Sequence, residues 1–163
     1  MRRIWSVAVA FVTGLFGCGP SGSTSSNGLA VAAPKDDPIL EVATSTARDS
    51  LGNFTACLKD PMPSQSQFSV KVAISSGGMV HYLWLQKITH KDGSFTGTLG
   101  PDAKGLEPHQ PGETITVREK EIFDWMYVDS GKLVGGYSLR ALRDQLSGKQ
   151  REAFEKSLWF SFD

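Results

Sequence analysis

Neither sign of charge is in excess in this sequence. Lys and Arg together number 17 of the 163 residues, and Asp and Glu together also number 17, so the formal net charge is zero. A protein that neutralises nucleic-acid phosphates normally has a basic excess, and so does a protein held on anionic lipid by a polybasic segment. The balance therefore argues against both of these classes.

The sequence also lacks an apolar run of the length that spans a bilayer comfortably. The N-terminal apolar run extends from Ile4 to Phe16, whereas a transmembrane helix needs about 20 residues. Arg2 and Arg3 precede this run, and residues rich in Gly and Ser follow it. A charged region, an apolar region and a small-residue region in this order indicate a secretory signal. A short transmembrane anchor is the alternative.

One of the two cysteines, Cys18, lies two residues after the end of the apolar run. The segment LFGC, Leu15 to Cys18, resembles the lipobox of bacterial lipoproteins. This resemblance implies a signal peptide over residues 1–17 and a lipid on the thiol of Cys18. Because Gly19 follows the cysteine, it also implies an outer-membrane protein that faces the periplasm. A plain secreted protein and a disulfide between Cys18 and Cys57 are the open alternatives.

Residues 18–35 are mostly small and polar and show no apolar periodicity. We interpret them as the lipidated cysteine and a flexible tether, which as a coil would extend on the order of 20–25 Å. The folded domain is then expected over residues 36–163. On this interpretation the membrane is one partner of the protein, through the lipid on Cys18.

Motifs that hold metals or activate nucleophiles are missing. His81, His90 and His109 fall in three different segments, and neither H-E-x-x-H nor a Cys/His cluster occurs. The sequence has no G-x-S-x-G elbow and no P-loop. We therefore expect neither a metal nor a cofactor.

Paired carboxylates are the remaining route to chemistry. Glu119 and Glu121 fall on one side of a predicted strand, which is also the pattern of a solvated face. A small hydrolase that uses Asp124 or Glu121 together with His81 or His109 is the enzymatic alternative. It requires these side chains to meet in one pocket.

What is present indicates an α+β fold. Pro38 suits the first turn of a helix, and one apolar stripe at helical spacing follows it, comprising Ala43, Ala47, Leu51, Phe54 and Leu58. Alternating or wholly apolar segments predict strands over residues 68–74, 79–88, 95–99, 114–119, 122–128 and 132–137. Two short helices are expected after them. The prediction is a curled antiparallel sheet of about five to six strands with one N-terminal and two C-terminal helices.

Several segments taken together resemble a known family. FSVKV, HYLWL, GSFTGTLG, IFDWMY and GGYSLRALR occur in this order over about residues 40–147. The set resembles the YegJ-like family, domain of unknown function 2314, with DWMY followed by GGYS as its most specific part. The resemblance implies a compact bacterial α+β domain and no established reaction.

The segment IFDWMYV contains three aromatic residues that a strand would direct to one face, Phe123, Trp125 and Tyr127. A buried core strand is the simpler interpretation. The alternative is a shallow aromatic groove, formed by Trp125 and Tyr127 and rimmed by Asp124, Tyr137 and Arg140, for a peptide or glycan.

Gly135 and Gly136 stand between this segment and the next predicted helix. Glycines permit positive φ or close backbone approach, and the helix start after them could accept an anion. They could equally serve only to turn the chain from strand to helix.

From the sequence we therefore expect a lipid-anchored envelope protein that acts as a binding or interaction module, with an envelope protein or peptide as its partner. The hydrolase and a purely structural envelope component are the alternatives. No nucleic-acid partner is expected.

Overall fold

The structure, a computed structural model, describes residues 38–162. The predicted signal peptide over residues 1–17 and the predicted tether with Cys18 lie outside these residues. Among the helices of the described part, none is long and apolar enough to cross a membrane.

Two helices begin the described chain. α1 covers Pro38–Asp49 and α2 covers Leu51–Lys59, where the sequence predicts one continuous helix. The interruption is at Ser50, whose φ of −99° and ψ of 4° depart from helical values and whose hydroxyl donates to Thr46 O at 2.7 Å. Serine side chains compete in this way with the helical backbone. The predicted apolar stripe still supplies the buried residues, namely Ala43, Ala47 and Phe54.

Six antiparallel strands form one sheet in the order β4-β3-β2-β1-β5-β6, which confirms the predicted α+β class. The strands are β1 Gln65–Ser76, β2 Met79–Lys91, β3 Ser94–Leu99, β4 Thr114–Arg118, β5 Ile122–Asp129 and β6 Lys132–Gly135. Glu119–Glu121 is a short 3₁₀ turn, η2, after β4. The prediction that Glu119 and Glu121 share one side of a strand is therefore wrong, because the strand has already ended.

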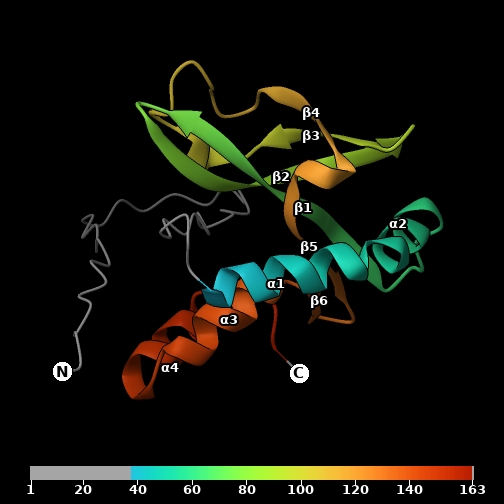
Figure 1. Cartoon of the computed structure of the whole chain (residues 1–163). Coiled ribbons are helices and arrows are strands. Elements are labelled where there is room, and N and C mark those ends of the chain that lie inside the picture. The colour runs from blue at the N-terminus through green and yellow to red at the C-terminus, as the bar shows by residue number, and fades with distance from the viewer. Residues whose placement is uncertain (1–37, 163) are drawn as a thin grey trace, which may run out of the picture.

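The sheet is strongly curled, as predicted (Figure 1). Its pairing register shifts around Gln67 of β1 and around Lys87 of β2. Both residues have positive φ, 58° and 51°. An extra residue in one strand of a pair bends and twists the sheet locally, so these two irregularities contribute to the curl.

The two faces of the sheet pack against different helices. One face meets α1 and α2 in the main core, whose largest buried side chains include Phe54, Leu83, Leu85, Phe95 and Trp125. The other face meets α3 and the C-terminal segment in a smaller cluster that contains Trp84, Met126, Leu133, Leu139 and Phe160.

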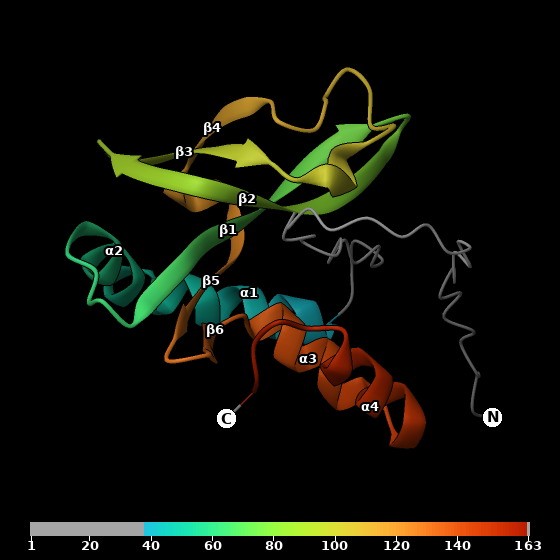
Figure 2. The same ribbon diagram turned by 180° about the vertical axis from the view of Figure 1, so that it is seen from behind.

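The two predicted C-terminal helices are present. α3 covers Tyr137–Gln145 and α4 covers Gly148–Lys156. Figure 2 shows both helices on the β5–β6 side of the molecule, away from β3 and β4. Between β3 and β4 lies a long loop with one 3₁₀ turn, η1, at Pro101–Ala103.

Candidate functional site

Asp124 is fully buried on β5 and caps the start of α3. Its Oδ1 accepts hydrogen bonds from the backbone N–H of Trp125 at 2.8 Å and of Tyr137 at 3.2 Å. Its Oδ2 accepts from both the N–H and the hydroxyl of Ser138, each at 2.7 Å. A carboxylate is favourable at the positive end of a helix, so Asp124 acts as an internal anion that fixes where α3 begins.

Lys71 of β1 lies directly opposite Asp124 in the β1–β5 register and is buried with it. Its Nζ donates to the Ser138 hydroxyl at 2.9 Å. Burial lowers the pKa of Lys71 to about 8, although the charges of Asp124 and Asp102 oppose this shift. Burial likewise raises the pKa of Asp124, against the hydrogen bonds from Ser138. We refer to these three residues as the Lys71–Ser138–Asp124 network.

The sequence did not identify Lys71 as part of a site. It alternates with Val70 and Val72 in the predicted strand, and an alternating polar residue is ordinarily on the solvent side. The signal that could have found it is the pairing of β1 with β5, because this register places Lys71 against Asp124. Pairing between strands about 50 residues apart is not visible in a local pattern.

Trp125 and Tyr127 are core residues, with 3% and 8% of their surfaces exposed. The Trp125 indole donates to Ala47 O at 2.8 Å and its ring stacks on Phe54 at 5.0 Å. The Tyr127 ring stacks on Phe68 at 4.9 Å. Of the two interpretations of this strand, the structure places these side chains as the core interpretation expects and leaves them little surface for a partner.

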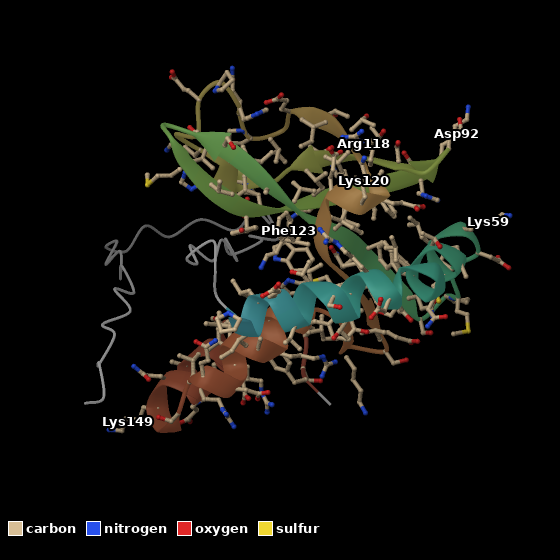
Figure 3. All side chains as sticks on the ribbon, in the orientation of Figure 1. Lys59, Asp92, Arg118, Lys120, Phe123 and Lys149 are labelled. Atoms are coloured by element: carbon tan, nitrogen blue, oxygen red, sulfur yellow. The ribbon has the colours of Figure 1, made fainter. Side chains whose placement is uncertain are left out.

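Phe123 does not share a face with these two aromatics. The β1–β5 register shifts between Lys71 and Val72, and the Phe123 ring packs edge-on against Tyr82 with 4.7 Å between ring centroids. Figure 3 shows Phe123 between α1 and the sheet. The prediction of three aromatics on one face is therefore wrong for Phe123, because a bulge interrupts the alternation.

Gly135 and Gly136 make the tight passage from β6 into α3. Both have positive φ, 71° and 63°, and a Cβ on Gly135 would overlap the carbonyl oxygen and ring of Trp125. The helix start that follows already holds the Asp124 carboxylate. The glycines thus serve close approach and turning, and the predicted anion position is occupied by the chain itself.

The two remaining predicted site residues are half-buried and tie elements together. The Tyr137 hydroxyl lies 3.0 Å from Ser50 Oγ. Arg140 Nε donates to Gly135 O at 2.9 Å and its Nη2 donates to Leu133 O at 2.7 Å. The contacts of Tyr137 and Arg140 hold α3 against α1 and β6.

Within residues 38–162, no hydrogen bond or ion pair joins Asp124 or Glu121 to His81 or His109, as the hydrolase alternative would require. The hydrogen bonds of Asp124 come from Ser138 and backbone groups, and Glu121 pairs with Arg118. His109 pairs with Glu113 at 3.2 Å. Within residues 38–162 no group of three or more His, Cys, Asp or Glu side chains could hold a metal ion.

A cavity of about 600 Å³ lies between α2 and β2 and is open to solvent. We call it the α2–β2 groove. Its lining comprises Gly52, Thr55, Ala56, Leu58 and Lys59 of α2 and Ile88, Thr89 and His90 of β2. It combines two hydroxyls, a cationic side chain and an apolar wall, and none of these lining residues is acidic.

His90 is held in place at the edge of the α2–β2 groove. Its Nε2 lies 2.7 Å from Glu119 Oε1, and its ring packs on Phe95 at 4.6 Å between ring centroids. Figure 3 shows Lys59 at the end of α2, on the same side of the molecule as Asp92 at the tip of the β2–β3 hairpin. Sequence reasoning named His90 but missed the groove, because its two walls are about 30 residues apart in the chain.

Comparison with known proteins agrees with the sequence resemblance. The model of the family described as "Uncharacterized protein conserved in bacteria (DUF2314)" matches residues 37–162. The "Uncharacterized protein YegJ" of Escherichia coli (strain K12) is 31% identical over 75 residues, which are 46% of this chain and 49% of that protein. No solved structure matches significantly.

A second relative is larger. A "putative ankyrin repeat protein" of Neisseria meningitidis serogroup B is 28% identical over 87 residues, which are 53% of this chain and 34% of that protein. The chain thus spans about half of the first relative's length and about a third of the second's.

Proposed function

Because the chain belongs to the DUF2314 family of uncharacterized bacterial proteins, we propose a function that rests on its own geometry: a binding module held at the cell envelope. The α2–β2 groove is its recognition site. The lipid on Cys18 is its anchor, in the outer membrane and facing the periplasm. An envelope protein that presents a short acidic peptide segment is its partner.

The observation that carries this proposal is the character of the α2–β2 groove. Ligand sites are typically cavities of about 300–1,000 Å³ with an apolar wall and a few polar groups that orient the ligand. The groove, at about 600 Å³, has Leu58 and Ile88 for apolar contact and the hydroxyls of Thr55 and Thr89 for hydrogen bonds. By contrast, Asp124 is engaged inside the fold.

The charge of the groove supports an acidic segment as the occupant. Lys59 contributes an ammonium group, and within the described residues no salt bridge pairs it with a carboxylate. His90 at the edge of the groove already lies 2.7 Å from Glu119 Oε1, so Lys59 is the cation that the groove offers to a ligand. A carboxylate in the ligand could pair with Lys59 and accept hydrogen bonds from the threonine hydroxyls.

The larger relative supports a binding role. Ankyrin repeats stack into extended concave surfaces that bind other proteins, and the related segment of the Neisseria protein occurs in a chain named for such repeats. A domain that occurs together with protein-binding repeats is better explained as a binding module than as a separate enzyme.

The groove proposal is tested with acidic and neutral peptides. The purified protein is titrated with fluorescent peptides rich in Asp and Glu and with matched peptides in which Asn and Gln replace them. We expect the acidic peptides to bind more tightly and Lys59→Glu to weaken this binding at least about tenfold, equivalent to about 1.4 kcal/mol. Binding is measured by fluorescence anisotropy.

Lys149→Glu is the matched control, because it makes the same charge change on α4, at the other end of the molecule from Lys59 (Figure 3). The two variants separate a local effect at the groove from an effect of net charge. Equal loss in both variants, or equal binding of acidic and neutral peptides, would refute the groove as the recognition site.

The lipid anchor is tested separately. Cys18→Ser removes the thiol that would carry the lipid, so we expect the protein to leave the membrane fraction and appear in the soluble periplasmic fraction. Fractionation followed by immunoblotting measures this distribution, with Cys57→Ser as the matched control. Unchanged membrane association of Cys18→Ser would contradict the lipoprotein interpretation without bearing on the groove.

A further inference from the structure

Trp84 of β2 carries a buried donor that has no partner in the described protein. The residue is 3% exposed, and its indole Nε1 is buried without a hydrogen-bond partner. Buried polar groups are normally hydrogen-bonded, and each exception calls for an explanation. Two other indoles do not pose this question, since Trp125 donates to Ala47 O and Trp159 is 45% exposed.

A second donor lies directly beside Trp84. Lys71 is opposite Trp84 in the β1–β2 register, and its Nζ lies 5.0 Å from the centroid of the Trp84 ring. The ammonium group has three N–H donors, and the hydrogen bond it makes in the described part of the chain goes to Ser138 Oγ at 2.9 Å. Lys71 is only 2% exposed, so bulk water does not readily satisfy the others.

The nearby acceptors of the protein are engaged elsewhere. Each carboxylate oxygen of Asp124 already accepts two hydrogen bonds. Asp102 in η1 interacts with Lys71 through its charge, and burial raises the pKa of Asp102. No hydrogen bond or salt bridge joins Asp102 to Lys71 among the interactions of the described residues. Among the described residues, the indole N–H of Trp84 therefore has no acceptor, and the ammonium group of Lys71 has donors to spare beyond its hydrogen bond to Ser138.

We propose that the domain holds one hydrogen-bond acceptor, a water molecule or a small inorganic anion, in a buried site between the indole N–H of Trp84 and the ammonium group of Lys71. A water molecule with two to four polar partners is the usual solution for such groups. A small anion would gain a charge-assisted hydrogen bond from Lys71 and would have to overcome the negative charges of Asp102 and Asp124.

The site bears on the helix that completes the fold. Lys71 donates to Ser138 in the first turn of α3, and the Trp84 ring packs in the same cluster as Leu139 of α3. An acceptor bound between Lys71 and Trp84 is thus coupled to the position of α3 through two separate contacts.

The test uses the full chain in detergent with ¹⁵N in the tryptophan indoles. Trp84→Phe assigns the Trp84 signal, and exposed Trp159 is the internal control. In the first arm, no anion is added beyond the buffer, and a cross-peak between the Trp84 indole proton and a long-lived water would support a water site. In the second arm, chloride and then inorganic phosphate are added, and a saturable shift of the Trp84 signal that Trp159 does not share would support an anion site.

Lys71→Met removes the ammonium group while keeping a similar length of side chain. We expect the anion response to weaken at least tenfold, or the water cross-peak to disappear, whichever the wild-type protein shows. An unchanged Trp125 signal, which reports the bond to Ala47, verifies that the variant is folded. If the variant unfolds, the two wild-type arms still decide the matter.

Two results would overturn the proposal. One is a wild-type Trp84 indole that shows neither a bound water nor a saturable anion shift. The other is a folded Lys71→Met protein whose Trp84 signal responds as the wild type does, because the ammonium group would then have no part in the site.

Discussion

The Lys71–Ser138–Asp124 network and the α2–β2 groove contain similar groups in opposite situations. Each contains a lysine and at least one side-chain hydroxyl. Each also has a carboxylate: Asp124 is part of the network, and Glu119 lies beside the groove. In the network these groups are buried and bond to one another. In the groove the lysine and the hydroxyls line an open cavity, and Glu119 lies beside it, paired with His90. The difference teaches that coverage by a neighbouring helix decides the role of a polar group: a covered group stabilises the fold, and an uncovered group is available to bind a ligand.

The largest effect that could break this comparison is expected for Asp124→Ala. The substitution leaves the charge of Lys71 and the start of α3 without their buried partner, and breaking a buried pair in this way costs about 3–5 kcal/mol. The free energy of unfolding, measured by urea denaturation, reports it. Asp144→Ala on α3 is the control, since its side chain is 69% exposed and surface substitutions usually change stability by less than about 0.5 kcal/mol. A loss of similar size in both variants would mean that the network does not build the fold.

Two glycines sharpen the comparison next: Gly135, just before the helix α3 that covers the network, and Gly52, in the lining of the groove. Gly135→Ala should destabilise the protein by about 2–4 kcal/mol, because the new Cβ overlaps Trp125 at a φ of 71° and both strain and overpacking have costs. Gly52 lines the groove on α2 with nothing within 4 Å of an added Cβ. Gly52→Ala should therefore stabilise the helix by about 0.5–1 kcal/mol. Thermal and urea unfolding of both variants check the opposite signs; destabilisation by Gly52→Ala would show that the groove is less open than described.

A smaller effect should appear in the pH dependence of stability. Burial lowers the pKa of Lys71 from its ordinary value of 10.5 to about 8, so above pH 8 the unfolded chain binds more protons at this residue than the folded chain. The contribution of Lys71 to the free energy of unfolding is therefore largest above the pKa that this residue has in the unfolded chain. This contribution is lost as the pH falls through the pKa of Lys71 in the folded protein. Over the window from about pH 8 to about pH 10, we expect the wild type to gain about 2 kcal/mol relative to Lys71→Met.

Urea unfolding of the wild type and Lys71→Met at several pH values measures this difference. Other groups that titrate in the window are present in both proteins and cancel in the comparison. Parallel profiles for the wild type and Lys71→Met would mean that the ammonium group of Lys71 is solvated after all.

Much of the architecture could be predicted from the sequence, since it depends on local pattern. Alternation along β5 placed Trp125 and Tyr127 on one face, and the stripe through Ala43, Ala47 and Phe54 identified the buried side of the first helices. The pattern was wrong where one residue changed the backbone locally. Ser50 interrupts the predicted single helix.

The candidate site was harder to predict, because its residues come together only through pairing and packing. The groove alternative placed Asp124 at the rim of a surface groove, yet Asp124 lies at the start of α3 with no exposed surface. Lys71 was expected in a half-exposed strand, yet β5 and α3 enclose it. The wall of the groove that contains Lys59 and the wall that contains His90 belong to different elements.

By itself, the sequence determined the family, the α+β class and the face to which most side chains point, because periodicities of about two and 3.6 residues arise from the backbone of each strand and helix. Only the tertiary structure decided which faces are covered. α3 closes over Asp124 and Lys71, whereas the space between α2 and β2 stays open beside Lys59. Whether a helix covers a given polar residue depends on contacts between segments that are far apart in the chain. A local sequence pattern does not contain this information.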